Sequence, residues 1–251
     1  MTMLYLAWQD EKDSRRWFVI GCLDRVQSGY RFRYVRQAEE ARGYGFEPIP
    51  GFEDFQVTYE SAELFSLFSN RLLSKSRPDY AGFLERIGVA EADADPLTIL
   101  SRTEGIRMTD KFEVFPMPEP DDSGYYHIVF LVRGIRHLPP ETEQLITSLR
   151  PGDRLRVVSE DANQFDCNAV IITTNDRQVG WVPRYFCTDI RDLEQLSPDG
   201  IELIVRRVNP PPAPVQLRLL CSLRAPWPDS WTPFNRPEYQ PLGDGSDGVA
   251  G

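Results

Sequence analysis

The residues of this chain best suited to chemistry lie in one short polar run, Asn-Gln-Phe-Asp-Cys-Asn-Ala-Val, at positions 163–170. Phe165 and Asp166 stand side by side within it. An aromatic ring can stack on a flat ligand, and a carboxylate can accept a hydrogen bond from a hydroxyl group. Asn and Asp side chains also stabilise turns by bonding to backbone amides. From the residue types alone, a structural turn is the stronger interpretation and a binding site is the alternative.

Two strand-like segments must position this run. Residues 154–158 and 169–173 are rich in β-branched, partly alternating apolar residues, which is typical of strands. A third strand-like segment follows at 179–182, and the sequence Gly-Trp-Val-Pro-Arg occupies positions 180–184. The pattern predicts a β-hairpin whose tip carries the polar run.

Composition restricts the class of protein. With 251 residues, of which 41% are hydrophobic and 26% charged, the chain resembles globular proteins of one large domain or two ordinary ones, and we expect two. No apolar run reaches the length of a membrane span, and charged residues at positions 10–13 lie where a signal peptide would be apolar. We therefore expect a cytoplasmic protein without a membrane partner.

The few cysteines and histidines argue against metal and nucleophilic chemistry. Structural zinc sites use clustered ligand pairs, and disulfides are rare in a reducing compartment. A hydrolytic triad would need His127, which lies in the middle of a predicted strand. We expect no metal, no other cofactor, and free, mostly buried thiols at the four cysteines, Cys22, Cys167, Cys187 and Cys221.

The formal net charge of −10 restricts the kind of nucleic-acid contact that the chain can make. Binding along a nucleic-acid backbone needs a cationic face that neutralises many phosphates. Every cation between residues 131 and 210 is an arginine, whose planar guanidinium can bind phosphate through two parallel hydrogen bonds. The charge therefore allows a local phosphate contact but not a long electropositive groove.

Residues 1–116 predict a small α+β module. Strand-like segments lie at 3–8, 17–21, 30–35 and 112–115, and the third places Tyr30, Phe32 and Tyr34 on the core face of an antiparallel sheet. Apolar residues at helical spacing predict helices at 62–73 and 79–87. A further helix should begin after Asp95, which would act as its N-cap, with Pro96 in the first turn.

Residues 117–125, rich in Pro and Asp, predict a linker. Residues 126–224 then predict a second domain that contains the hairpin. Its other predicted elements are strands at 126–133, 201–207 and 215–223, a turn at Gly134, and helices at 141–149 and 184–196. Residues 225–251, rich in Pro and Gly, predict a partly disordered tail. The fold class predicted for the whole chain is α+β.

The second domain resembles the HIRAN domain, a module of SWI/SNF-type fork-remodelling helicases that also occurs in bacterial proteins. Four features between residues 129 and 194 carry the likeness. They are Gly-Ile-Arg-His at 134–137, Pro-Gly-Asp at 151–153, the polar run at 163–170, and Val-Gly-Trp-Val-Pro-Arg at 179–184. The resemblance implies an OB- or SH3-like antiparallel β-barrel with two short helices that captures the 3′ end of single-stranded DNA.

Carried over position by position, the resemblance implies a DNA-binding site. Phe165 would stack on a terminal base, and Asp166, supported by Asn163, would accept the hydrogen bond of the terminal 3′-hydroxyl. Arg136 would hold a phosphate. The chain departs from the family pattern where Phe165 and His137 replace tyrosines and Gln164 replaces a proline. The full set of implied site residues is Arg136, His137, Asn163, Phe165, Asp166, Asn168, Trp181 and Arg184.

The first module resembles, more faintly, the N-terminal subdomain of HipA-type toxin kinases. The likeness runs through residues 20–23, 30–34, 64–73, 95–100 and 113–116. In that family the subdomain contacts partners, and some systems encode it as a separate antitoxin chain. The nucleotide-binding loop and catalytic Asp of a kinase are missing from the sequence, so we expect no kinase activity.

These observations predict a non-enzymatic binding protein of bacterial type. Its HIRAN-like domain would recognise single-stranded DNA 3′ ends, and its HipA-N-terminal-like module would contact a protein partner. The alternative is a protein-interaction module without DNA binding, either antitoxin-like or a subunit of a bacterial defence complex. A nuclease or phosphatase using a metal ion held by Asp161 and Asp166 is a weaker alternative, because no further ligand is near them in the sequence.

Overall fold

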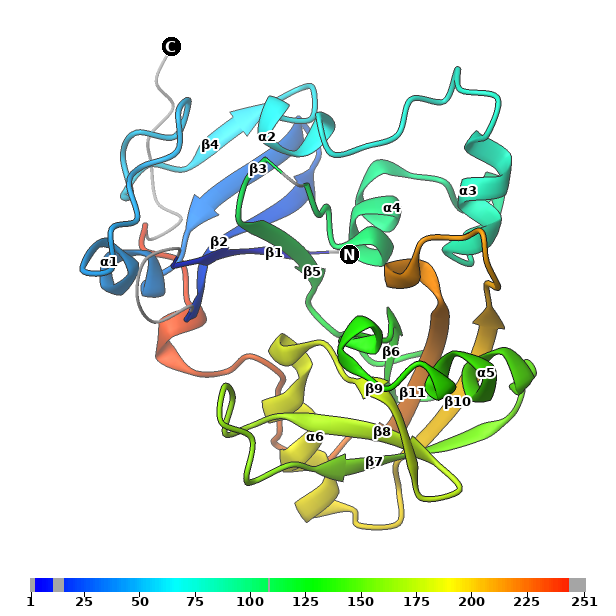
Figure 1. Cartoon of the computed structure of the whole chain (residues 1–251). Helices are drawn as coiled ribbons and strands as arrows, with labels where there is room; N and C mark the ends of the chain where they lie inside the picture. Colours follow the sequence, from blue (N-terminus) through cyan, green and yellow to red (C-terminus); the bar gives the residue numbers. More distant parts are fainter. Residues whose placement is uncertain (1–2, 11–15, 108, 244–251) are drawn as a thin grey trace. The chain divides into compact units, whose positions relative to one another are not determined.

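The computed structural model describes residues 3–10, 16–107 and 109–243 (Figure 1). Contacts divide the chain into two compact units. One comprises Met1–Arg77, Asp93–Met117 and Phe234–Gly251, and the other comprises Pro78–Ala92 and Pro118–Pro233. Within the described residues, each unit contains one antiparallel sheet together with short helices. The α+β class predicted from the sequence is therefore confirmed.

This division differs in two places from the boundaries drawn on the sequence. Residues 78–92, grouped there with the N-terminal module, make their contacts in the second unit, and the described residues from Phe234 to Gly243 belong to the first. Phe234 is buried, and its ring packs on Tyr5 and Phe115. The start of the predicted tail is thus ordered by aromatic packing. Residues 244–251, for which the sequence also predicts disorder, lie outside the described residues.

The sheet of the first unit has the strand order β4-β3-β2-β1-β5. Its strands are β1 (Leu4–Gln9), β2 (Trp17–Val26), β3 (Gly29–Tyr34), β4 (Tyr59–Ser61) and β5 (Phe112–Pro116). The helical segments of this unit are α1 (Gln37–Arg42), α2 (Ser66–Ser69), α4 (Pro96–Thr103) and the 3₁₀ turn η4 (Pro237–Tyr239). The strands predicted at 3–8, 17–21, 30–35 and 112–115 are all present.

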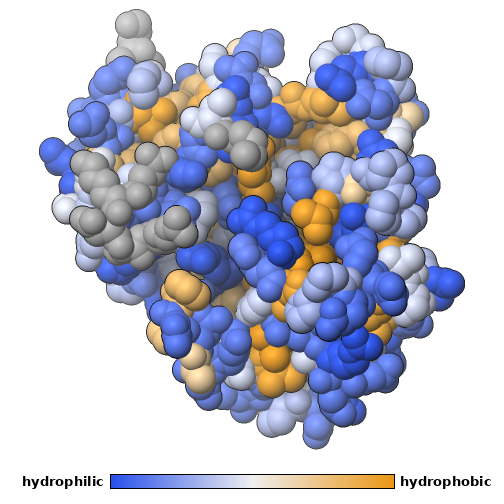
Figure 2. Space-filling view, viewed as in Figure 1, coloured by the Kyte–Doolittle hydropathy of each residue, from blue (hydrophilic) through white to orange (hydrophobic). Residues whose placement is uncertain are grey.

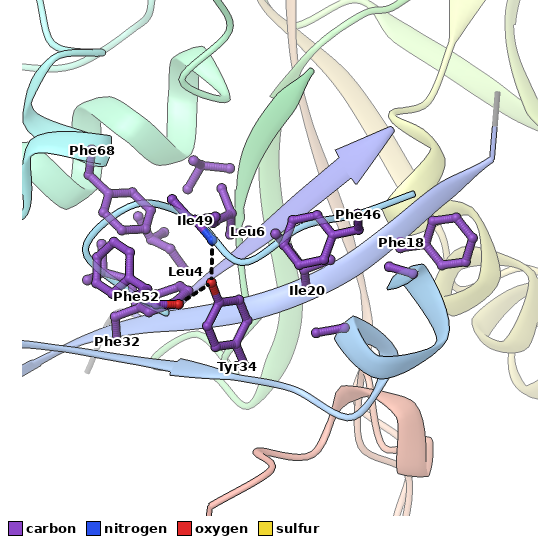
Figure 3. Packing of buried hydrophobic residues seen from close by; sticks show 14 of the residues in the cluster. Leu4, Leu6, Phe18, Ile20, Phe32, Tyr34, Phe46, Ile49, Phe52 and Phe68 are labelled. Carbon is purple, nitrogen blue, oxygen red and sulfur yellow. Dashed lines mark hydrogen bonds between the residues drawn. The ribbon is translucent and has the colours of Figure 1, made fainter. Parts of the chain in front are cut away.

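Aromatic and aliphatic side chains form the core of the first unit (Figure 3). Phe32 and Tyr34 are fully buried, which confirms that these alternating aromatics of β3 are core residues. Tyr34 accepts a hydrogen bond from the backbone N–H of Ile49 at 2.9 Å and donates one to the carbonyl oxygen of Phe52 at 2.8 Å. Burial raises the pKa of Tyr34 to about 12. The phenol therefore stays neutral, with its hydrogen-bonding capacity satisfied inside the core.

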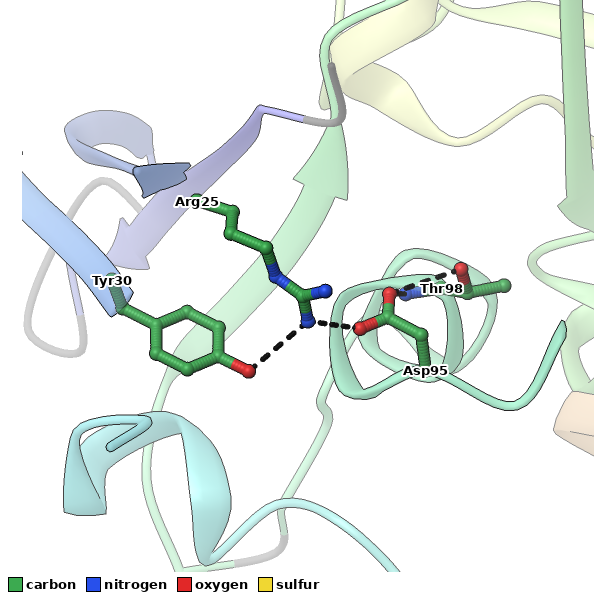
Figure 4. A network of polar contacts seen from close by, with 4 residues as sticks. All are labelled: Arg25, Tyr30, Asp95 and Thr98. Carbon is green, nitrogen blue, oxygen red and sulfur yellow. Dashed lines mark hydrogen bonds and ion pairs between the residues drawn. The ribbon is translucent and has the colours of Figure 1, made fainter. Parts of the chain in front are cut away.

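A polar network connects α4 to the sheet of the first unit (Figure 4). Asp95 caps α4 by accepting a hydrogen bond from the backbone N–H of Thr98 at 3.2 Å, as the sequence predicts. Arg25 of β2 donates to the same carboxylate and, at 3.1 Å, to the phenol oxygen of Tyr30. Because these groups are partly exposed, the network fixes the position of the helix more than it adds stability.

The helix predicted at 62–73 is wrong. Tyr59–Ser61 pairs with β3 as β4, and helical structure is confined to Ser66–Ser69 in this stretch. Arg71 donates its Nε to the carbonyl oxygen of Leu67 at 2.9 Å, an acceptor that a longer helix would use for its own backbone. The apolar residues that suggested the helix still pack against the core, and they are Leu64, Phe65, Leu67, Phe68 and Leu72. Their spacing reflects burial rather than helical conformation.

The sheet of the second unit has the strand order β6-β11-β10-β7-β8-β9. Just beyond β6, the backbone of Arg133 forms an isolated bridge with Trp181 at the end of β9. Within the described residues β6 and β9 share no ladder, so the closed barrel implied by the resemblance is not found there. The strands are β6 (Tyr125–Leu131), β7 (Arg154–Ser159), β8 (Val170–Thr174), β9 (Arg177–Trp181), β10 (Glu202–Val208) and β11 (Leu219–Pro226).

Helices α3 (Tyr80–Arg86), α5 (Glu141–Ser148) and α6 (Arg184–Leu196) belong to the second unit, with 3₁₀ turns η2 (Ile135–His137) and η3 (Val215–Leu217). A further turn, η1 (Glu91–Asp93), lies where the chain leaves that unit. The bounds of α6 match the predicted helix at 184–196. The strand predicted at 215–223 begins later, at Leu219, because the residues after Pro214 form η3.

The surface and the thiols complete the description of the fold. Cys22, Cys187 and Cys221 are buried, Cys167 is exposed, and all four are free, as the sequence predicts. No helix in the described part of the chain is long and apolar enough to cross a bilayer. The face drawn in Figure 2 is mostly hydrophilic, with patches of apolar residues. Among the large apolar side chains that the structure describes, Phe165 is the most exposed, at 91%.

Candidate nucleic-acid interface

The polar run predicted from the sequence forms the loop between β7 and β8, residues 160–169. Its ends are paired, because the backbone N–H of Glu160 donates to the carbonyl oxygen of Ala169 at 2.8 Å. Within it, Oδ1 of Asn163 accepts from the backbone N–H groups of Phe165 at 2.9 Å and Asp166 at 3.0 Å. The loop conformation is therefore set by the side chain of Asn163, as an Asx turn.

Glu160 connects this loop to the rest of the sheet. Its Oε2 accepts hydrogen bonds from Nδ2 of Asn163 at 2.7 Å and from the indole Nε1 of Trp181 at 2.8 Å. The set of site residues drawn from the sequence does not include Glu160. In the sequence, only the position of Glu160 just before the polar run pointed to this residue. Its hydrogen bond with Trp181 joins residues 21 apart in the chain and is visible only in the folded structure.

Trp181 brings three distant segments together. Its backbone N–H and carbonyl each bond with the backbone of Arg133 at 2.9 Å. Its ring lies over Gly134, where an added Cβ would come within 2.2 Å of the indole, and where φ is +72°. Its Nε1 holds Glu160 of the loop. Half-buried and fully engaged, Trp181 positions the site rather than offering its ring to a ligand.

Phe165 projects from the loop with 91% of its surface exposed. The backbone N–H of Phe165 donates to Oδ1 of Asn163 at 2.9 Å. Oδ1 of the next residue, Asp166, accepts from the backbone N–H of Asn168 at 3.0 Å. The ring is therefore carried by a backbone that its own neighbours fix. An exposed aromatic on a fixed backbone is suited to stacking against a planar ligand.

Arginines flank these segments. Arg136 and His137 are exposed in η2, where Nε of Arg136 donates to Nε2 of His137 at 3.0 Å. Arg184 is exposed at the first position of α6. Burial lowers the pKa of Arg133, the charge and hydrogen bond of Tyr185 oppose this shift, and the positive charges of Arg184 and Arg136 add to it. The backbone bridge between Arg133 and Trp181 brings the segments that carry Arg136 and Arg184 together.

Two carboxylates of the loop have different surroundings. Asp166 is half-buried. Burial raises the pKa of the Cys187 thiol in α6 to about 12, and the charge of Asp166 raises it further. Asp161 is exposed and forms an ion pair with Arg191. No cluster of His, Cys, Asp and Glu in the described residues could hold a metal ion. Asp166 is therefore the better placed of the two to accept a hydrogen bond from a ligand.

The structure places the sequence-derived site residues in two groups around Trp181. One group lies in the loop and consists of Asn163, Phe165, Asp166 and Asn168. In the other group, Arg136 and His137 follow Arg133, whose backbone bridges to Trp181, and Arg184 follows Trp181 in the chain. Of these residues, Asn163 and Trp181 support the loop. The side chains of Phe165, Arg136, His137, Asn168 and Arg184 are exposed to solvent.

Comparisons with known proteins give little further information. No protein-family model matches the chain, and no curated protein matches it. A crystal structure of a protein from Lactobacillus plantarum, solved as a structural-genomics target, is similar at 22% identity over 41% of this chain and 97% of that chain. With a TM-score of 0.32, this likeness carries no assignment of fold or function.

Proposed function

We propose that this protein binds the 3′ end of single-stranded DNA at the loop 160–169 and the arginines beside it, and that it does so without catalysing a reaction. One observation supports the proposal above the others. The ring of Phe165 is 91% exposed on a loop whose backbone N–H groups donate hydrogen bonds to Oδ1 of Asn163. A base that stacks on such a ring orders few new groups, so little of the stacking free energy is lost to conformational entropy.

The charges around the loop suit one strand end. Arg136 and Arg184 offer guanidinium groups to the backbone phosphates. The half-buried carboxylate of Asp166 would accept a hydrogen bond from a terminal hydroxyl, whereas a terminal phosphate would bring like charge beside it. The net charge of −10 opposes binding along an extended strand. The proposed site is therefore small and holds the last one or two nucleotides.

We further infer that the second unit is an open relative of OB- or SH3-like barrels and corresponds to a HIRAN-like domain. The bridge between Arg133 and Trp181 supports this inference, because it brings the two outermost strands of the sheet together at one point. The motifs at 134–137, 163–170 and 179–184 support it independently, since the structure gathers all three around Trp181.

Fluorescence anisotropy with labelled oligonucleotides of one sequence tests the proposal. The strands would end in a 3′-hydroxyl or a 3′-phosphate, and a circular single strand would serve as the control without ends. We expect the tightest binding to the 3′-hydroxyl strand. Equal binding to all three, or no binding to any, would overturn the proposal. In that case a stable protein partner captured from the native host without DNA would favour the protein-interaction alternative.

A further inference from the structure

A second feature of the second unit lies in the cleft between α3 and the connection from β10 to η3. The cleft has a volume of about 390 Å³, which is within the range of small-ligand sites. One wall is formed by Gly82, Glu85 and Arg86 of α3. The opposite wall is formed by Arg207, Asn209 and the proline-rich segment 210–214. The corresponding elements, α3 and the segment after β10, lie side by side in Figure 1.

Asn209 fixes the two walls relative to each other. It is 4% exposed, and its Nδ2 donates to the carbonyl oxygens of Arg86 at 2.9 Å and Leu217 at 2.6 Å. Its own carbonyl accepts from Nη1 of Arg218 at 2.7 Å. Because the buried side-chain amide makes two of these bonds and the backbone carbonyl accepts the third, Asn209 has little freedom, and the cleft is formed before any ligand arrives.

The cleft is positively charged although the protein is acidic. Arg86 and Arg207 face it, against one carboxylate, Glu85. The Nε of Arg86 is buried and finds no hydrogen-bond partner among the residues that the structure describes. An added Cβ on Gly82 would lie 3.5 Å from Nη1 of Arg86, so the guanidinium lies along the α3 wall. A buried donor of this kind costs free energy. Because Nε is shielded from the cleft, an anion in the cleft would bind Arg86 through the Nη groups at the outer end of the guanidinium.

Glu85 forms an ion pair with the second arginine of the cleft, Arg207. Nη1 of Arg207 lies 3.0 Å from Oε1 of Glu85, and the two side chains are 38% and 67% exposed. Exposed ion pairs of this kind contribute little stability, so an incoming anion can displace the carboxylate at small cost. The prolines of the opposite wall carry no N–H groups, and their rings offer apolar surface.

From these features we infer that the cleft binds a small organic anion, in which a carboxylate or phosphate group is attached to an apolar ring. The anionic group would lie between Arg86 and Arg207, where guanidinium groups can bind two oxygens together. The ring would pack against Pro210, Pro212 and Pro214. This site involves none of the residues of the loop 160–169.

Two-dimensional NMR of the full chain tests the inference with three probes: phenyl phosphate, benzoate and inorganic phosphate. Phenyl phosphate and benzoate distinguish the two anionic groups, and inorganic phosphate shows what the ring contributes. Sodium chloride at equal ionic strength is the control. We expect a saturable shift of the Nε–Hε resonance of Arg86, identified by its loss in Arg86→Gln, and of the amide resonance of Asn209, with at least one of the ring-bearing probes.

Three further variants make the test decisive. Arg207→Gln should weaken binding about tenfold or more, the loss expected for hydrogen bonds to a charged group. Arg206→Gln removes the same charge from the neighbouring exposed residue outside the cleft and should leave binding unchanged. Glu85→Gln alters an exposed side chain and should tighten binding, because it releases Arg207. The absence of a saturable shift with every probe, equal losses at positions 206 and 207, or no gain with Glu85→Gln would overturn the inference.

Discussion

Replacement of Glu160 by alanine should destabilise the second unit by removing the acceptor that holds the loop 160–169 to Trp181. A hydrogen bond to a charged group contributes about 1.5–3 kcal/mol when it is buried. Two such bonds end on Oε2 of Glu160, from Asn163 at 2.7 Å and Trp181 at 2.8 Å. All three side chains are half-buried, so water recovers part of this energy. We expect a total loss of about 2–3 kcal/mol for Glu160→Ala.

Thermal unfolding followed by tryptophan fluorescence measures this loss. For a unit of this size the change corresponds to a decrease of about 4–10 °C in the unfolding temperature. Glu160→Gln should lose less, because the amide oxygen can still accept from both donors without the charge. Asp161→Ala provides the matched control: this neighbouring carboxylate is 84% exposed in its ion pair with Arg191, so its removal should have a smaller effect.

A double-mutant cycle makes the reasoning refutable. Trp181→Phe keeps a ring over Gly134 but removes the indole donor, so Glu160→Ala and Trp181→Phe should be coupled by about 1 kcal/mol. If their effects add without coupling, or if Glu160→Ala costs no more than Asp161→Ala, the account of Glu160 as the link between loop and sheet is wrong.

Two other predictions concern titratable groups. The backbone N–H of Tyr125 and the guanidinium of Arg224 hold the pKa of Asp121 below its ordinary value of 3.8. Its stabilising effect is therefore complete above pH 3.8 and is lost as the pH falls through the lowered value, so Asp121→Asn should be less stable than wild type at neutral pH, with a difference in unfolding temperature that vanishes in acid. Native protein should expose one thiol, Cys167, to a thiol reagent. Burial raises the pKa of Cys22 to about 11 and that of Cys187 to about 12, and it also raises the pKa of Cys221. These three thiols should therefore react only after unfolding.

Much of the fold follows from local patterns in the sequence. The alternation in β3, the Asp-Pro cap at residues 95–96 and the amphipathic helix at 184–196 each depend on neighbours within one or two turns, and all three are present. The failure at 62–73 has the opposite origin. There the apolar residues pack against the core of the first unit although most of the segment is not helical. The side chain of Arg71 donates to the carbonyl oxygen of Leu67, which a continuing helix would use as a backbone acceptor.

The candidate site also contains some features that the local sequence predicts and others that depend on distant contacts. The sequence predicts the turn chemistry of Asn163 and the position of Phe165 at the tip, because both depend on residues within the loop. It does not predict the role of Glu160 or the supporting role of Trp181. Those depend on the approach of β9 to the loop and to Gly134, which only the folded sheet defines.

The affinity of Phe165 variants for a single strand with a 3′-hydroxyl end tests the central claim most directly. Because the ring is 91% exposed, Phe165→Ala and Phe165→Tyr should both unfold at the wild-type temperature. Phe165→Tyr keeps the stacking face and should bind as wild type does. Phe165→Ala should bind about 5–150-fold more weakly, which corresponds to the loss of one stacked base at about 1–3 kcal/mol. Binding by Phe165→Ala that equals that of wild type would contradict the account.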